Sequence, residues 1–293
     1  MERKRRPGPS VRVRVREYAA AGEDESGHAP PPRSREDRLA TEEPLEVRAS
    51  WPGQPAQRVA VTMRTPGHDF ELAAGLLYAE GVLDPAALHS VAYCTDEELA
   101  PEEEFNVVTV RLATAPGRLP SPRPGTVTAS SSACGVCGTT SIDDVMAMRG
   151  APARAEEAAT VTRELLHTLP GRLREAQRVF ESTGGLHAAG WFDSEGRLVV
   201  LREDIGRHNA VDKVVGSRLL AGESTAAPVL CVSGRIGFEI VQKAVAAGVG
   251  VVAAIGAPSS LAVRLAEEAG LGLVGFLSAR RFVVYTAPDR VAG

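Results

Sequence analysis

The sequence predicts an α/β protein in which a larger C-terminal α/β domain follows a smaller α+β part. Three observations support this fold class. From about residue 163 onward, apolar runs of strand length alternate with segments of helical length, which is typical of a sheet with covering helices. Runs such as 249–255 are apolar along their length, as in strands buried on both faces. The helical segments end at or near a glycine. We therefore expect a largely parallel sheet covered on both faces.

Length, charge and cysteine content limit the class of protein. The 293 residues suffice for one large or two modest domains. Charged residues make up 24% and the formal net charge is −4, so no overall positive field favours nucleic acid as a partner. No apolar run reaches membrane-spanning length. Four cysteines with one close pair are unlike a secreted disulfide scaffold. We expect a cytoplasmic protein without nucleic-acid or membrane partners.

Residues 1–42 are predicted to contain one strand and a flexible segment. Valine and arginine alternate over residues 11–16, which places three valines on one face of a strand. Arginines between the valines are typical of an edge strand. Residues 19–37 are rich in glycine, proline and acidic residues, so we expect a flexible excursion there.

Residues 43–128 are predicted to form the smaller α+β part. Strands are expected at 59–63 and at 105–112. Asp69 ends a polar turn after the first of these strands, and aspartate commonly caps helices. The helix that it is predicted to cap runs to Gly81.

Residues 141–293 are predicted to form the C-terminal α/β domain. Strands are expected at 187–192, 197–202, 229–232, 249–255, 271–276 and 282–285. Helices are expected at 208–220, 238–247 and 259–269. Ligands bind at the carboxyl ends of strands in open α/β sheets, so the turns after these strands are candidate binding positions.

A loop at residues 129–140 carries the close cysteine pair Cys134 and Cys137. Glycines flank the pair and serines precede it, so we expect a mobile loop with accessible sulfurs. Metal ligation, disulfide exchange and sulfur relay compete as its role. A structural zinc ion needs about four ligands, usually from a second close pair that this sequence lacks. We therefore predict no metal site.

The two remaining cysteines give little support to a metal site. Cys94 is isolated, and Cys231 lies within an apolar strand, where a buried and inert thiol is expected. A thioredoxin-type site would place the cysteine pair directly after a strand, whereas a Pro/Ser-rich stretch precedes it here. A mobile thiolate suits a relay between two partners. The spacing alone does not decide among the three roles.

Polar side chains gather where predicted strands begin or end. His187 follows a glycine pair at the start of one strand, and the next strand runs into a densely polar stretch that includes Arg207. Loops held by a rigid scaffold often carry function, so we predict that His187 and Arg207 contact a ligand. The alternatives are a salt-bridged loop that caps the following helix and, for His187, a structural hydrogen bond.

Two further turns have features of a nucleotide site. Ser233-Gly234-Arg235 lies between a predicted strand and a predicted helix, where helix amides and the Arg235 guanidinium can hold a phosphate. The later turn offers the ring of Phe276 and the cations Arg280 and Arg281. A ring for a base and cations for phosphates suggest a nucleotide. Neither turn is a Walker or Rossmann fingerprint, which argues against ATP hydrolysis and hydride transfer.

Seven segments together resemble the FdhD family, the sulfurtransferases needed for active formate dehydrogenase. The segments are RTPGHDFELAAGLLYAEG, SSSACGVCG, STGGLHAAG, REDIGRHNAVDKVVG, SGRIGFEIVQKAVAAGV, APSSLAVRLAEEAGL and GFLSARRFVVYT, within about residues 41–285. The resemblance implies a C-terminal domain with the cytidine deaminase fold. It also implies a homodimer in the cytoplasm.

The activity implied by the resemblance is sulfur transfer. The family's C-x-x-C loop accepts sulfur from a cysteine desulfurase and passes it to the molybdenum cofactor in its bis-molybdopterin guanine dinucleotide form, which serves formate dehydrogenase. On this chain Cys134 matches the persulfide-bearing cysteine and Cys137 its partner. The family's cofactor-binding stretch matches Phe276, Leu277, Ser278, Ala279, Arg280 and Arg281. Guanosine diphosphate (GDP) is then the expected surrogate ligand. Arg235, His187 and Arg207 join this set from their chemistry alone.

Two other functions stay open. A non-catalytic chaperone would bind the molybdenum cofactor and deliver it to the dehydrogenase without using either thiol. A zinc deaminase would need an H-x-E element followed by P-C-x-x-C. Here the cysteines precede His187 and position 189 is alanine, so the glutamate that shuttles protons for a zinc-bound water is missing.

Overall fold

The computed structural model describes residues 6–20, 31–94, 104–118 and 160–293. The N-terminal part contains β1 (Ser10–Glu17), β2 (Arg33–Ala40), β3 (Glu43–Trp51), β4 (Gln54–Arg64), α1 (Asp69–Ala79), the 3-10 helix η1 (Pro85–Ala87), β5 (Leu88–Tyr93) and β6 (Val107–Leu112). The C-terminal part contains β7 (Val161–Thr162), α3 (Arg163–Ala176), α4 (Arg178–Thr183), β8 (His187–Phe192), β9 (Leu198–Asp204), α5 (Arg207–Leu220), β10 (Val229–Val232), α6 (Phe238–Ala246), β11 (Val251–Ala254), α7 (Ser260–Ala269), β12 (Gly272–Gly275), β13 (Val283–Thr286), the 3-10 helix η3 (Pro288–Arg290) and β14 (Val291–Ala292).

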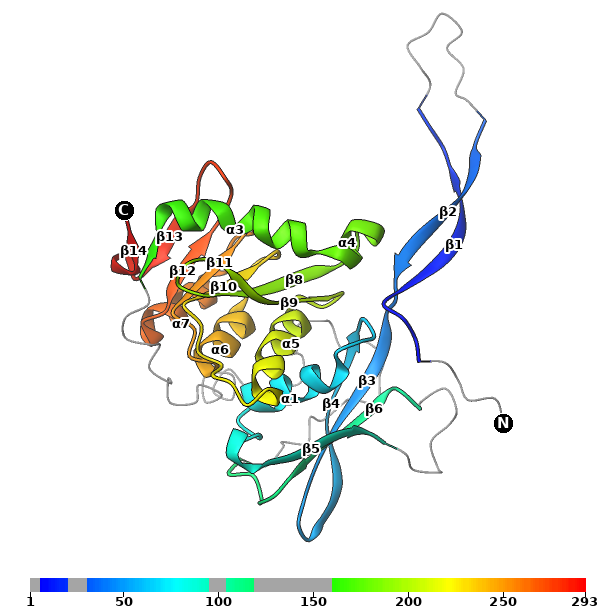
Figure 1. Ribbon diagram of the computed structural model, residues 1–293, viewed down its shortest axis with the longest axis vertical. Coiled ribbons are helices and arrows are strands. Elements are labelled where there is room, and N and C mark those ends of the chain that lie inside the picture. Colours follow the sequence, from blue (N-terminus) through cyan, green and yellow to red (C-terminus); the bar gives the residue numbers. More distant parts are fainter. Residues whose placement is uncertain (1–5, 21–30, 95–103, 119–159) are drawn as a thin grey trace, which may run out of the picture.

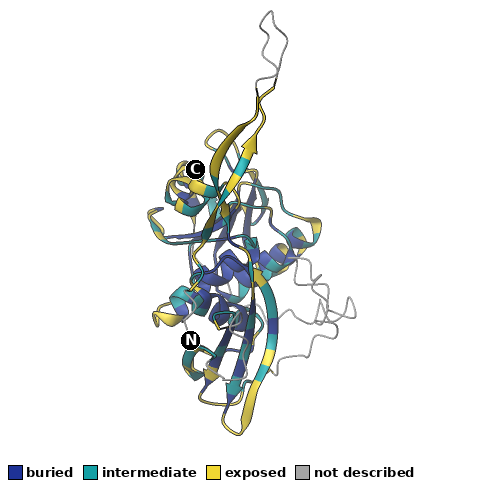
Figure 2. Cartoon of the chain, turned by 90° about the vertical axis from the view of Figure 1, so that its right-hand side faces the viewer, coloured by how far each residue is buried: buried dark blue, intermediate teal, exposed yellow. Residues whose placement is uncertain are grey.

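β1 and β2 form a two-stranded antiparallel ribbon that projects from the rest of the molecule (Figure 1). The predicted strand is present as β1, which pairs with β2 and with no other strand among the described residues. The prediction that residues 33–37 belong to a flexible excursion is wrong, because they form the first part of β2. Their backbone pairs with residues 13–17 of β1, and the exposed Arg35 side chain lies 3.4 Å from Glu17 across the ribbon and 3.0 Å from Asp37. Charge pairing replaces apolar burial here, and most of the ribbon is exposed (Figure 2).

The N-terminal part is built on a four-stranded sheet with the order β4-β3-β6-β5. β3 and β6 are parallel, and the other two pairs are antiparallel. Alternate side chains of β3, Leu45, Val47 and Ala49, are fully buried in the same core as helix α1. Asp69 is not the helix cap that its position predicts. His68 caps α1 in a left-handed conformation with φ of 57°, and the Asp69 carboxylate accepts a 3.0 Å hydrogen bond from Arg64 instead.

The C-terminal part is built on a six-stranded sheet with the order β13-β12-β11-β10-β8-β9. Only β10, β11 and β12 run parallel, whereas β8, β9 and β13 pair antiparallel with their neighbours. The expectation of a largely parallel sheet is therefore wrong. Short turns connect β8 to β9 and β12 to β13, and such short connections join antiparallel neighbours, while parallel neighbours need a crossover. The mixed α/β class itself is confirmed.

Helices cover both faces of this sheet, as predicted. Helix α3 lies on one face, and α5, α6 and α7 lie on the other (Figure 1). Along β10, Val229 and Cys231 pack with the α3 face, whereas Leu230 and Val232 pack with the α5–α7 face. This division explains why the strand is apolar at every position.

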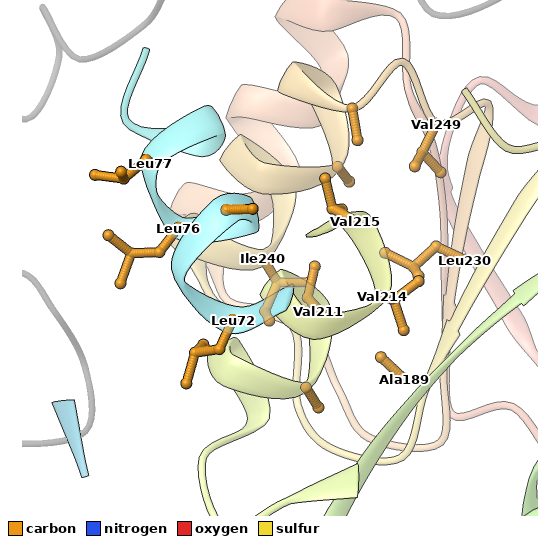
Figure 3. Close-up of a cluster of buried hydrophobic side chains, with 14 of the residues drawn as sticks. Leu72, Leu76, Leu77, Ala189, Val211, Val214, Val215, Leu230, Ile240 and Val249 are labelled. Atoms are coloured by element: carbon orange, nitrogen blue, oxygen red, sulfur yellow. The ribbon is translucent and has the colours of Figure 1, made fainter. Parts of the chain in front are cut away.

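Helices α1 and α5 join the two parts of the chain. Figure 3 shows the leucines of α1 beside the valines of α5 and, beyond them, Leu230 of the sheet. The helices approach so closely that a Cβ on Gly75 would overlap the backbone of Asp212, and a Cβ on Gly216 would overlap the backbone of Glu71. One continuous apolar core therefore extends from β3 to β12.

Candidate functional site

Five segments meet at one edge of the six-stranded sheet. β9 ends beside the start of β8, where Asp204 pairs with His187. The turn after β10 continues from this pair, since Ser233 donates from its amide to the Ala188 carbonyl at 2.9 Å. The turns after β11 and β12 follow, with hydrogen bonds from Gly256 N to Gly234 O at 3.2 Å and from Phe276 N to Gly256 O at 3.1 Å. The chain thus brings the predicted positions 187, 207, 235 and 276–281 to one edge.

Two glycines allow these turns to lie in contact. A Cβ on Gly256 would come 2.8 Å from the Gly234 carbonyl oxygen, too close for any larger residue to fit without movement. A Cβ on Gly234 would come 3.2 Å from His187 Nδ1 and 3.5 Å from Arg207 Cδ. His187 and Arg207 therefore both lie against Gly234.

The His187 imidazole lies in an environment that favours its neutral form. It is half-buried at the start of β8. Burial lowers the pKa of His187, and the positive charge of Arg207 lowers it further, while the Asp204 carboxylate acts in the opposite direction. A neutral imidazole can both donate and accept a hydrogen bond. His187 can therefore contact either a donor or an acceptor on a ligand.

Phe276 and Leu277 begin the turn after β12 and point in different directions. Phe276 has a φ of 51°, a left-handed conformation that is uncommon for residues other than glycine, and its side chain is 41% exposed. Such strain at an exposed residue is often retained for function. Leu277 is 1% exposed and belongs to the core on the α3 face. Its side chain is thus a core residue, although the sequence places it within the cofactor-binding stretch.

The rest of this turn presents two arginines to solvent. Ala279, Arg280 and Arg281 are exposed, and the Arg281 guanidinium lies 5.7 Å from the centre of the Phe276 ring. Ser278 closes the turn, because its hydroxyl oxygen accepts hydrogen bonds from the amides of Arg280 at 3.3 Å and Arg281 at 3.1 Å. An exposed ring beside two cations is suited to a base and its phosphates.

Arg235 completes the basic edge. Its side chain is exposed in the turn between β10 and helix α6. Gly237 is the N-cap of α6 and provides no side-chain acceptor for the first amides of the helix. Arg235, together with these amides, can therefore contact an anionic group at the same edge.

Most of the polar stretch at the end of β9 has a structural role. The Asp204 carboxylate, which is fully buried, lies 2.6 Å from Lys213 Nζ and accepts hydrogen bonds from Asn209 Nδ2 at 3.0 Å and the Thr65 amide at 3.2 Å. Glu203 accepts from the amides at the start of α4. The salt-bridged part of the alternative is thus correct for these residues. The capping part is wrong, because Glu203 caps α4 rather than the following helix, and Gly206, the N-cap residue of α5, provides no side-chain cap. Within the stretch, Arg207 is the one that lies against Gly234 and His187.

The same polar cluster ties the N-terminal part to the site. Thr65 belongs to the turn after β4, and its carbonyl accepts a 2.9 Å hydrogen bond from Lys213, while its hydroxyl accepts a 3.1 Å bond from the Ile205 amide. Asn209 Nδ2 also donates to the Met63 carbonyl at 2.8 Å. The position of the turn that carries Arg207 therefore depends on both parts of the chain.

His167 is a neighbour of the site that the sequence does not reveal. Its Nδ1 lies 2.9 Å from the Ser278 carbonyl oxygen, and its ring centre lies 5.0 Å from that of Phe282. The contact joins residues that are 111 positions apart. In the sequence, His167 lies in an amphipathic helical segment, and no local pattern distinguishes it from a histidine that is exposed to solvent.

The predicted sulfur-carrying cysteines, Cys134 and Cys137, lie outside the described residues. Of the other two, Cys231 is fully buried, and burial raises the pKa of its thiol to about 12. This agrees with the inert thiol that the sequence predicts. Cys94 is partly exposed, with Arg48 at 3.8 Å from its sulfur. Among the residues that the structure describes, no cluster of three or more histidine, cysteine or acidic side chains could hold a metal ion.

None of the described helices is both long enough and apolar enough to cross a membrane.

Comparison with known proteins gives a consistent result. The model of the FdhD/NarQ family matches residues 40–292. A sulfur carrier protein FdhD from Streptomyces coelicolor is 50% identical over 262 residues, which cover 88% of this chain and 90% of the relative. The protein of the same name from Mycobacterium tuberculosis is 46% identical over 269 residues, covering 88% and 93% of the two chains. That from Thermoplasma volcanium is 40% identical over 258 residues, covering 87% and 90%.

A solved structure has the same fold. The crystal structure of a proposed formate dehydrogenase accessory protein from Desulfotalea psychrophila matches with a TM-score of 0.69 and covers 97% of this chain and 99% of its own. The two sequences are 20% identical, so this likeness bears on the fold alone. It supports the mixed α/β architecture. The likeness of the C-terminal domain to the cytidine deaminase fold stays a prediction.

Proposed function

This chain belongs to the FdhD/NarQ family, and from that membership we propose that it is a sulfur carrier in the maturation of formate dehydrogenase. The observation that carries the proposal is 50% identity, over nearly the full length of both chains, with a protein named as a sulfur carrier. The arrangement of the described residues adds a basic edge with an exposed aromatic ring, which suits a nucleotide-bearing client.

The proposed transfer uses Cys134 as the sulfur carrier. The Cys134 thiolate attacks the terminal sulfur of a persulfide on a cysteine desulfurase. A new sulfur–sulfur bond forms on Cys134, the bond in the donor breaks, and the desulfurase thiolate leaves with the electron pair. One sulfur atom moves and no external oxidant or reductant is consumed. The chain then acts as a sulfurtransferase with a persulfide intermediate.

Cys137 is proposed to act on this persulfide in one of two ways. Its thiolate can attack the terminal sulfur, which moves the sulfur to Cys137 and restores the Cys134 thiolate. It can instead attack the Cys134 sulfur, which forms a disulfide between the two cysteines and releases hydrosulfide. The first route keeps the sulfur atom on the chain, and the second releases it as hydrosulfide.

The proposed client is the bis-molybdopterin guanine dinucleotide form of the molybdenum cofactor, and its guanine nucleotide is proposed to lie across the sheet edge. Phe276 would contact the base, while Arg280, Arg281, Arg235 and Arg207 would contact phosphates. GDP is the soluble surrogate for this interaction. Replacing Arg280 and Arg281 together with alanine should weaken GDP binding, most strongly at low salt, where charge interactions are least screened. Unchanged affinity would place the nucleotide elsewhere.

A second candidate is a chaperone that binds the cofactor without carrying sulfur. The described site favours it as much as it favours a carrier, because the basic edge can bind a nucleotide whether or not a thiol reacts. The family membership favours the carrier. The proposed partners are a cysteine desulfurase and a formate dehydrogenase, and the proposed assembly is a cytoplasmic homodimer, which light scattering of the purified protein would test.

The test compares two properties in cells that rely on this chain for formate dehydrogenase activity. A sulfur carrier with Cys134→Ala should bind the molybdenum cofactor as wild type does, yet give no active dehydrogenase. Cys231→Ala is the matched control, because that thiol is buried and unreactive. Full dehydrogenase activity with Cys134→Ala and with the double variant Cys134→Ala/Cys137→Ala would favour the chaperone.

A further inference from the structure

The turn that carries Arg280 and Arg281 is fixed to the sheet at its first half. The Phe276 amide donates to Gly256 O at 3.1 Å, and the Leu277 amide donates to Ala254 O at 2.9 Å. The Leu277 side chain is buried beneath the turn. These contacts hold the chain as far as Leu277, but the arginines follow three and four residues later.

The second half of the turn is held from another element, helix α3. His167 Nδ1 lies 2.9 Å from Ser278 O, and because a carbonyl oxygen can only accept, the imidazole donates. Its ring also packs against Phe282, just after the turn. Leu166 and Leu169 bury α3 against the sheet, so the core determines where the imidazole lies.

Ser278 orients both arginines. Its amide donates to Arg281 O at 2.9 Å, and its hydroxyl binds the amides of Arg280 and Arg281. A rotation of the backbone at Ser278 would therefore move both guanidinium groups. His167 holds the Ser278 carbonyl, which belongs to the next peptide group, between Ser278 and Ala279, and which accepts none of the bonds within the turn named above.

We propose that His167 is a positioning residue for guanine-nucleotide binding, which acts by fixing the Ser278 carbonyl and thereby the two arginines. This inference rests on the proposed function, because Arg280 and Arg281 contact the nucleotide only under that proposal. His167 itself is assigned no ligand contact. Loss of one hydrogen bond that orders a binding turn should weaken GDP binding by about fivefold to tenfold.

The experiment measures GDP affinity by calorimetry on the full chain, together with thermal unfolding. The variants are His167→Ala, His167→Asn, Arg280→Ala/Arg281→Ala, and His167→Ala combined with the arginine pair. Asparagine can place an amide donor near the position of Nδ1, so His167→Asn should restore most of the affinity. His89→Ala removes an exposed imidazole from β5 in the N-terminal part and is the matched control.

The expected result is a non-additive cycle. His167→Ala should weaken GDP binding in the wild-type background and have no further effect once both arginines are gone. Equal losses in the two backgrounds, or no recovery with His167→Asn at unchanged thermal stability, would overturn the positioning role. If the arginine pair alone leaves GDP affinity unchanged, the proposed nucleotide site fails. If the arginine pair weakens binding and His167→Ala does not, only the present inference fails.

Discussion

At the scale of single residues, sequence type alone does not separate ligand contacts from structural ones. Arg207 and Lys213 are both cations of helix α5, yet Lys213 is buried and paired with Asp204, whereas Arg207 lies against Gly234 and His187. Leu277 shows the same limit, since Phe276 beside it is exposed whereas the Leu277 side chain belongs to the core. Burial of this kind depends on tertiary packing, which no local pattern contains.

The pKa of His187 gives a direct test of the geometry at the edge. Burial lowers this pKa first and the charge of Arg207 lowers it further. We predict that Arg207→Gln raises the pKa of His187, as measured by NMR titration of the imidazole, because it removes a positive charge. Arg207→Lys keeps the charge and should preserve the low value. A pKa that stays the same in Arg207→Gln would show that the two side chains do not interact.

The ion pair between Glu71 and Arg202 predicts a loss of stability in acid. Burial alone would raise the pKa of Glu71, but hydrogen bonds from Arg202 and His68 outweigh it and lower the value to about 2. Because the folded pKa is below the unfolded one, this contribution is present above about pH 4.5 and is lost as the pH falls toward 2. The shift alone would correspond to about 3 kcal/mol at neutral pH, and solvent screening of this partly buried pair reduces the contribution below that figure.

The measurement is urea unfolding of wild type and Glu71→Gln as a function of pH. The wild type should be more stable at neutral pH, and the difference in unfolding free energy should shrink below about pH 4.5. A difference that is constant from pH 7 to pH 3 would contradict the assigned ion pair.

At the scale of elements, local pattern predicts the buried strands well and their direction poorly. β8 and β10 begin and end where the sequence predicts. The antiparallel direction of β8, β9 and β13 is not encoded in strand periodicity, which is the same for either direction. β2 is missed because six of its eight side chains are exposed and most are polar, so it carries no apolar alternation by which a strand is recognised.

The crossing of α1 and α5 is predicted to tolerate no side chain at its closest point. Gly216→Ala places a methyl group within the backbone of α1, so the unfolding free energy should fall by about 3 kcal/mol or more. Gly171→Ala in α3 is the control, because that glycine is exposed with open space around it. The unfolding free energy of Gly171→Ala should rise by about 0.5–1 kcal/mol, because alanine favours the helix more than glycine does. Equal urea midpoints for Gly216→Ala and wild type would mean that the helices do not meet as described.

The β1–β2 ribbon is predicted to be dispensable for folding. Its residues contribute nothing to either apolar core of the described chain, and the family match begins only at residue 40. A chain that starts at residue 41 should therefore unfold in one cooperative transition with a midpoint close to that of the full chain. Loss of cooperative unfolding would show that the ribbon is part of the folding unit.

At the scale of the whole molecule, the two parts of the chain form one structural unit around the proposed site. The apolar core runs through both, and Thr65 of the N-terminal part binds Lys213 and Asp204 beside the sheet edge. The basic edge is thus supported from both sides. The sequence predicts which residues reach this edge, because they lie where successive strands begin or end, but it does not predict their support from α3 and β4.

The central claim is that the chain carries sulfur on Cys134. The most direct test is the intact mass of the reduced protein, with persulfide trapping, after incubation with a cysteine desulfurase and cysteine. We predict a gain of one sulfur atom, about 32 Da, in wild type and in Cys231→Ala, and no gain in Cys134→Ala. A sulfur gain that persists in Cys134→Ala, or that is absent from wild type, would contradict the account.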